Sequence, residues 1–162
     1  MKVILATNDF NYEGRYERIC EMVNSFIKRG RFEFYAFCTG EEETESDIIS
    51  FLRVGDGFGI RECLSHARYV VGEERFFLVL EKNAQKTDYA KMLKSHLENG
   101  CGITVGAIGV KGDTWENTGV FIVESEYLDM IDGIDSFERD IVVPCAESGE
   151  LNVFFSNKKA ST

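Results

Sequence analysis

The sequence predicts a three-layer α/β domain whose sheet is mostly parallel, and residues 75–110 carry most of that prediction. Phe76–Leu80 is an unbroken apolar run that is long enough for a strand but too short for a helix. A strand that is apolar on both faces is usually a parallel strand covered by helices, so we expect this one at the centre of the sheet. The 162 residues, 44% of them hydrophobic, suit one domain spanning 1–162 with an ordinary core.

A helix and a further strand complete this central unit. Thr87 is placed to cap a helix whose apolar residues fall on one stripe, and Asn99–Gly100 would end that helix. Residues 102–110 are apolar again, which predicts a strand–helix–strand unit with a right-handed crossover. Ligands of such sheets bind beyond the carboxyl ends of the strands, which makes the polar residues 81–83 candidates for a site.

The amino-terminal part of the chain shows the same alternation of strand and helix. Residues 2–7 predict a buried strand, and residues 8–12 predict a polar loop after it. A helix follows, because its apolar residues recur at spacings of three and four, and Gly30 would end it. Residues 32–38 predict the next strand, so the chain opens with strand, helix and strand.

The remaining segments predict shorter elements. Ser46 is placed to cap a short helix that carries the apolar residues of 48–52. The glycine-rich stretch 55–59 precedes another helix, and its glycines form either a plain turn or a loop around a phosphate. The last third predicts a strand at 118–123, a short helix at 126–131, a strand or extended piece at 141–143 and a strand at 151–155.

The charge and the cysteines exclude several classes of protein. A net charge of −10 and a pI of about 4.7 argue against a nucleic-acid-binding surface or binding to an anionic membrane. No apolar run approaches transmembrane length, and the first residues do not resemble a signal peptide. The five cysteines are scattered without a C-x-x-C pair, which is typical of reduced thiols in a cytoplasmic protein. No ligand spacing predicts a zinc site.

Several segments share their order and local pattern with a known enzyme family. Residues 26–40 show a helix end, a glycine, a strand and Thr-Gly, and residues 93–105 show L-x-x-H-x-x-x-G followed by T-V. Residues 117–123 show N-x-G-x-F, and residues 130–151 match a final helix-and-loop block. In this order the chain resembles the sugar-1-phosphate nucleotidyltransferases, and among them the glucose-1-phosphate cytidylyltransferases most. The resemblance implies a Rossmann-like, nucleotide-diphospho-sugar-transferase-like fold that binds a sugar phosphate or a nucleotide.

The catalytic motifs of that family are degenerate in this sequence. The family's G-G-x-G-T-R loop corresponds to residues 6–15, where only Gly14 and Arg15 echo it. The P-K-P lysine is missing, since the sole proline is Pro144, and Asn83 stands where the family has a metal-binding aspartate. The E-K-P and D-x-G-T motifs also have no counterpart. This chemistry depends on a metal ion and on cationic side chains, so we expect a shortened relative without full activity. We expect no residue of this chain to act as a catalytic group or as a metal ligand. Mg²⁺ would be a cofactor only if the protein were active.

The predicted ligand site lies at the carboxyl ends of the parallel strands. Arg15 is the main cationic group and could meet a phosphate, whereas Asp9 and Glu13 would repel a triphosphate. A sugar or a monophosphorylated sugar therefore fits better than a nucleoside triphosphate. The resemblance implies that residues of the N-x-G-x-F strand contact the sugar part of the ligand. The predicted substrate-binding residues are Asn8, Asp9, Gly14, Arg15, Asn83, Asn117 and Gly119.

A second hypothesis belongs to a different class: an acidic regulator or inhibitor that binds another protein through the same fold. Glu41–Glu45 is either solvent-facing charge or a docking surface, and Trp115, in a loop predicted at 111–116, would be an exposed anchor. His96 is predicted to be a packed surface histidine rather than a catalytic base. Stabilisation of the protein by a sugar phosphate or a nucleotide would favour the first hypothesis.

Overall fold

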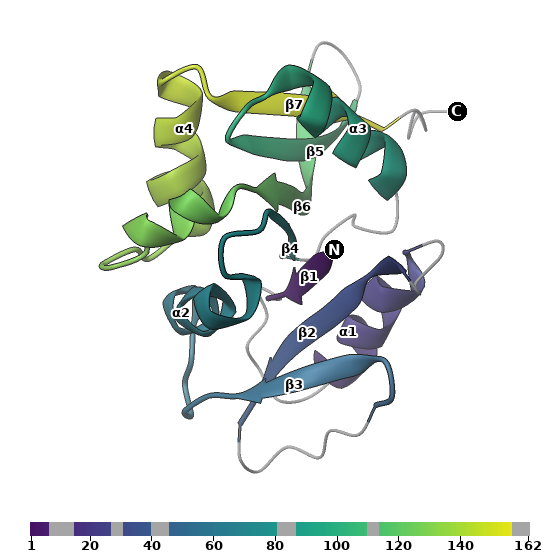
Figure 1. The fold of residues 1–162 in the computed structure, drawn as a ribbon, viewed down its shortest axis with the longest axis vertical. Coiled ribbons are helices and arrows are strands. Elements are labelled where there is room, and N and C mark those ends of the chain that lie inside the picture. Colours follow the sequence, from purple (N-terminus) through teal and green to yellow (C-terminus); the bar gives the residue numbers. More distant parts are fainter. Residues whose placement is uncertain (7–14, 27–30, 40–45, 81–86, 110–113, 157–162) are drawn as a thin grey trace.

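The fold is described from a computed structural model of the chain (Figure 1). The residues described are 1–6, 15–26, 31–39, 46–80, 87–109 and 114–156, with only the backbone of Arg15. Within these residues, one seven-stranded sheet carries helices on both of its faces.

The sheet is mostly parallel, as the sequence predicts. Its strands run in the order β3-β2-β1-β4-β6-β5-β7. The neighbours from β3 to β4 are parallel, β7 is parallel to β5, and β6 is antiparallel to both β4 and β5. The strands are β1 (Lys2–Leu5), β2 (Glu33–Cys38), β3 (Ile49–Arg53), β4 (Phe76–Val79), β5 (Ile103–Gly109), β6 (Trp115–Val123) and β7 (Leu151–Phe155).

Strand β4 occupies the central position that its apolar run predicts, fourth among the seven. Phe76, Leu78 and Leu80 face one side of the sheet, and Phe77 and Val79 face the other. All five side chains are at most 2% exposed, because helices cover both sides of this strand.

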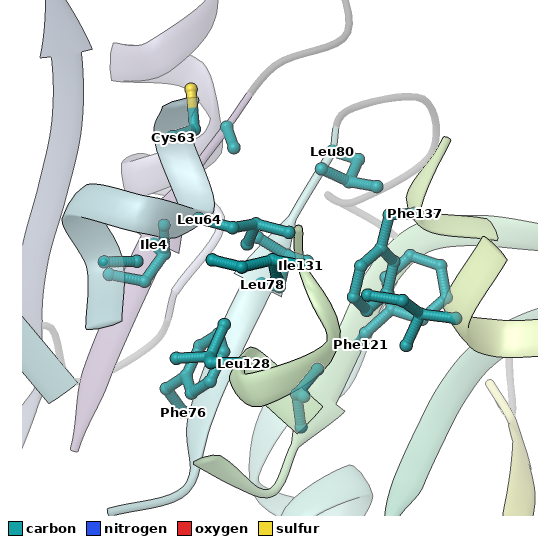
Figure 2. Packing of buried hydrophobic residues seen from close by; sticks show 14 of the residues in the cluster. Ile4, Cys63, Leu64, Phe76, Leu78, Leu80, Phe121, Leu128, Ile131 and Phe137 are labelled. Atoms are coloured by element: carbon teal, nitrogen blue, oxygen red, sulfur yellow. The ribbon is translucent and has the colours of Figure 1, made fainter. Parts of the chain in front are cut away.

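Helices complete the three predicted layers. On one face, Phe26, just after α1, stacks on Tyr89 of α3 with ring centroids 3.6 Å apart. On the other face, Leu64 and Leu128 pack on the central strands (Figure 2). Among the described residues, no helix combines the length and apolarity needed to cross a membrane. The helical segments are α1 (Arg15–Asn24), α2 (Ile60–Val71), α3 (Tyr89–Asn99), the 3₁₀ segment η3 (Ser125–Met130), the π-helical segment η4 (Glu138–Val142) and α4 (Val143–Glu147).

The predicted strand–helix–strand unit is present as β4, α3 and β5, but β4 and β5 are not neighbours. Strand β6 lies between them and runs antiparallel to both. The Asp88 side chain accepts a hydrogen bond from the Lys91 N–H at 3.2 Å, so Asp88 rather than Thr87 caps α3. Gly100, at φ +63°, ends the helix as predicted.

Two predicted elements are wrong in type. Residues 48–52 lie in or beside strand β3 and form no helix, because the backbone of β3 pairs in parallel with β2. The Ser46 hydroxyl accepts two backbone N–H groups at 3.1 Å and closes a turn before the strand. Residues 141–143 are helical, in η4 and α4, and not extended. The buried side chains of Ile141 and Cys145 are four residues apart, which puts both on one helix face toward the core.

Candidate functional site

The carboxyl ends of strands β1 to β4 lie along one side of the sheet, here called the carboxyl edge. The Ala6 N–H donates to the Val79 carbonyl at 2.9 Å, and the Val54 N–H donates to the Cys38 carbonyl at 2.8 Å. Because α1, α2 and α3 each follow a parallel strand, all three helices begin at this edge. Their N-termini carry partial positive charge, which favours an anionic group of a ligand.

Three of the seven predicted site residues belong to described elements. Arg15 is the first residue of α1, at the carboxyl edge beside β1. Asn117 and Gly119 lie in β6, which reaches the same edge because it runs antiparallel to β4. The other four predicted residues lie outside the described part of the chain: Asn8, Asp9, Gly14 and Asn83.

Gly119 marks a bulge in strand β6. Its φ of +79° lies in the left-handed region that favours glycine. Between two successive pairs at this point, β5 advances by two residues and β6 by four. The Gly119 carbonyl accepts the Leu80 N–H at 2.6 Å, which joins the bulge to the carboxyl end of the central strand.

The Asn117 side chain holds this bulge in place. Its Oδ1 accepts the Gly119 N–H at 2.9 Å, and its Nδ2 donates to Glu138 Oε2 at 3.2 Å. The N-x-G pattern therefore has a structural role, since both backbone polar groups of the buried Gly119 are bonded within the protein. The predicted contact of Asn117 and Gly119 with a ligand stays a prediction.

Two side chains near the predicted site were missed by the sequence analysis. Arg53 ends β3, is exposed, and donates from Nη1 to the Thr39 carbonyl at 3.2 Å. The preceding residues were predicted to be helical, so the end of a strand could not be located there. Glu138 reaches Asn117 from η4, 21 residues further along the chain, and no local pattern signals that contact.

The glycine-rich stretch before α2 forms a turn. Gly57 has a φ of +73°, and the Gly59 N–H donates to Glu62 Oε2 at 2.9 Å. Hydrogen bonds from the backbone N–H groups of Glu62 and Gly59 lower the pKa of the Glu62 carboxyl, despite partial desolvation. This carboxylate occupies the N-terminus of α2, so the turn interpretation is favoured over a phosphate-binding loop.

The opposite side of the sheet, where β1 to β4 begin, is here called the amino edge, and it holds a chain of paired polar groups. His96 is 2% exposed and does not lie at the surface as predicted. Its Nδ1 lies 2.7 Å from Thr104 Oγ1, and its Nε2 lies 2.6 Å from Glu124 Oε2. The same Glu124 oxygen accepts a hydrogen bond from Arg75 Nε at 2.8 Å. The local sequence could not reveal this burial, because both partners of His96 are distant along the chain.

Asn152 extends this chain of groups, here called the His96 network, because its Nδ2 donates to Thr104 Oγ1 at 3.1 Å. The Glu124 carboxylate can only accept a hydrogen bond, so the proton between Glu124 and His96 belongs to Nε2 of the imidazole. Although desolvation acts in the opposite direction, hydrogen bonds from Arg75 and His96 lower the pKa of Glu124. Thr104 is 0% exposed, so this carboxylate–imidazole–hydroxyl series has a structural role.

The surface features named by the second hypothesis are only partly described. Trp115 begins β6 and does not lie in a loop; it is 45% exposed and contacts Phe155 edge-on, with ring centroids 6.1 Å apart. Glu41–Glu45 lies outside the described residues, as does 81–83. In the part of the chain that the structure covers, no group of three or more His, Cys, Asp or Glu residues is arranged to hold a metal ion.

Comparison with known proteins identifies the fold. No protein-family model matches the chain, and no curated protein matches it. Among solved structures, a putative glucose-1-phosphate thymidylyltransferase from Bacillus anthracis in complex with sucrose superposes with a TM-score of 0.67 at 12% identity. The match covers 95% of this chain and 85% of that chain. The chain therefore has a nucleotidyltransferase-like, Rossmann-like fold, in agreement with the sequence resemblance.

Proposed function

We propose that this protein binds a sugar phosphate or a nucleotide at the carboxyl edge of its sheet, without full nucleotidyltransferase activity. The bulge at Gly119, joined to the end of β4 by the Leu80 hydrogen bond, is the observation that supports this site most. Such irregularities are common beside binding sites, because they re-aim backbone and side chains. The structure of the Bacillus anthracis protein is a complex with sucrose, which supports a sugar as the class of ligand at the level of the fold.

Charge favours a ligand with one phosphate over a triphosphate. Arg15 begins α1 at this edge, where the helix N-terminus adds partial positive charge. Glu138 brings a carboxylate to Asn117 near the bulge, and Asp9 and Glu13 add acidic groups in the sequence before α1. A sugar monophosphate can pair its phosphate with the one cationic side chain and form hydrogen bonds from its hydroxyls to the other polar groups. A triphosphate needs more cationic groups to balance its charge.

Loss of the catalytic motifs supports the absence of full activity. The sequence has no counterpart of the family's P-K-P lysine, and Asn83 replaces its metal-binding aspartate. Without the lysine and with a neutral side chain at the metal position, charge in the transition state is poorly stabilised. Steady Mg²⁺-dependent release of pyrophosphate from a nucleoside triphosphate and a sugar 1-phosphate would contradict this part of the proposal.

Thermal unfolding with glucose 1-phosphate, and separately with CTP and Mg²⁺, tests the binding. At a hundredfold excess over its Kd, a bound compound stabilises the fold by about 2.7 kcal/mol. Arg15→Ala should abolish this stabilisation without unfolding the protein. Arg31→Ala is the matched control, because Arg31 is exposed and adjoins the start of β2 at the amino edge. Equal stabilisation of the parent and Arg15→Ala would refute the site.

A second function, the acidic protein-binding regulator, has its own supporting observation. Residues 124–150 contain nine acidic residues and one arginine, a net charge of −8 in a chain whose total is −10. This segment forms η3, η4 and α4 on one face of the sheet (Figure 1). Arg61, Arg68 and Arg75 from neighbouring parts of the chain pair with Asp135, Asp129 and Glu124 and offset some of this charge. The negative charge that remains steers positively charged partners toward this part of the molecule.

A further inference from the structure

A groove with an apolar floor runs over η3, η4 and α4. A hollow of about 590 Å³ is lined by the buried Ile141 and Cys145, the half-buried Tyr127 and the exposed Met130 and Pro144. Met130 is 48% exposed, so an apolar side chain lies at the surface of this hollow above the buried floor. The hollow is here called the acidic groove, because acidic residues line it as well.

Four carboxylates stand around the acidic groove, and two of them have no ionic partner. Asp129 is paired with Arg68, and Asp140 is paired with Arg139. Among the described residues, Glu126 and Glu150 form no side-chain hydrogen bond or ion pair, and both line the groove.

The two unpaired carboxylates, Glu126 and Glu150, stand close to the phenol of Tyr127. Desolvation is the main cause that raises the pKa of Tyr127, the hydrogen bond with Cys145 is the next, and the negative charges of Glu150 and Glu126 add to it. Both uncompensated carboxylates line the acidic groove together with Tyr127.

A second, smaller hollow shares these two carboxylates. It encloses about 260 Å³ and is lined by Glu126 and Glu150 together with Glu124 and Leu97. Arg75 also lines this smaller hollow, where it pairs with Glu124 and not with Glu126 or Glu150. Leu97, 52% exposed, lines the smaller hollow, and Met130 lines the acidic groove, so each hollow has an exposed apolar side chain.

The floor of the acidic groove is held rigidly from below. Tyr127 packs directly on Gly102, where even a Cβ atom would overlap the Tyr127 ring. Its hydroxyl accepts a hydrogen bond from Cys145 Sγ at 3.5 Å, which joins η3 to α4. Because the groove is fixed before binding, a partner loses less free energy in ordering it.

We propose that the acidic groove binds a basic amphipathic segment of another protein. The apolar side chains of that segment would pack on Met130 and Pro144, and its lysine or arginine side chains would pair with Glu126 and Glu150. Charge complementarity selects this occupant. A second copy of the chain would bring the same negative charge onto the groove, and a nucleic acid would be repelled. The groove adjoins the proposed sugar site through η4, but Glu138 faces Asn117 and does not line the groove. The proposal rests on the protein-binding function and not on sugar binding, so failure of one leaves the other standing.

A synthetic helical peptide of leucine and lysine tests this proposal by fluorescence anisotropy against the intact protein. The double variant Glu126→Lys/Glu150→Lys should weaken binding by about tenfold or more, because two attractive charges become repulsive. The matched control is Glu21→Lys/Asp47→Lys, which reverses two exposed acidic residues on and near other elements and should leave binding unchanged. Met130→Ser should also weaken binding, whereas Ile48→Ser, at a residue 47% exposed, should not.

Three outcomes would overturn the proposal. The first is equal binding of the peptide to both charge-reversal variants. The second is equally tight binding of polylysine of the same charge, since a purely electrostatic contact needs no apolar floor. The third is sedimentation as a dimer that Met130→Ser disrupts, since a second copy would then occupy the groove. Circular dichroism of each variant verifies that it remains folded.

Discussion

The two ends of the central strand β4 use their polar groups in different ways. At the amino end, Arg75, Glu124 and His96 pair with one another and with Thr104, and the imidazole is sealed from water. At the carboxyl end, Leu80 meets the bulge of Gly119, and helix N-termini face the same edge. At the amino end, polar side chains hold α3 against the sheet. At the carboxyl end, the backbone is irregular at the bulge, and this is the end at which ligands of such sheets bind.

Removal of the His96 imidazole should have the largest effect on stability, because it disrupts the polar network at the amino end of β4. We expect His96→Ala to lower the free energy of unfolding by about 2–4 kcal/mol, since it creates a cavity and removes one hydrogen bond each from Thr104 and Glu124. These two residues then keep Asn152 and Arg75 as partners. Urea denaturation measures the loss. His66→Ala is the control, because His66 lies exposed on α2. Equal stability of the two variants would mean that the His96 network stabilises nothing.

A side chain at the bulge should have a smaller effect at the carboxyl end. Gly119→Ala forces alanine to adopt a φ of +79°, so we expect a loss of about 1–2 kcal/mol in the same denaturation experiment. Gly109→Ala is the control: Gly109 is exposed in β5, and a Cβ there would meet nothing within 4 Å. Should Gly119→Ala match that control, the bulge does not constrain the strand.

The charge of Glu124 should have the smallest effect on stability, and the pH dependence of unfolding measures it. Because the pKa of Glu124 is lowered in the folded protein, its ionised form stabilises the fold above its unfolded pKa. That contribution is lost as the pH falls below 4.5 through the folded value. The stability difference between the parent and Glu124→Gln should therefore be largest near neutral pH and shrink in acid. A difference that stays constant over this range would show that Glu124 does not act through its charge.

Local sequence predicts the middle of this fold well and its long-range contacts poorly. The five buried residues of Phe76–Leu80 identify a central strand, because only burial on both faces tolerates that pattern. Residues 48–52 were misassigned as a helix, since a short apolar run is compatible with either helix or strand. His96 was placed at the surface because Thr104 and Glu124 are 8 and 28 residues away in the chain.

The candidate site was predicted in part for the same reason. Gly119 and Asn117 could be selected from the N-x-G-x-F resemblance, but the bulge between them depends on pairing with β5 and β4. Arg53 was missed because its strand was missed, and Glu138 because it reaches the site from a separate helical segment. Residue patterns thus identify the strands, whereas pairing between strands decides which side chains meet.

Amide chemical shifts of the ¹⁵N-labelled protein, titrated with glucose 1-phosphate, test the central claim that the carboxyl edge is the ligand end. We predict that the Gly119 amide and the Asn117 side-chain amide shift, together with residues at the start of α1. The His96 ring and the Leu97 amide, at the amino edge, should stay unchanged. Shifts confined to the amino edge, or none at all at saturating concentration, would contradict the account.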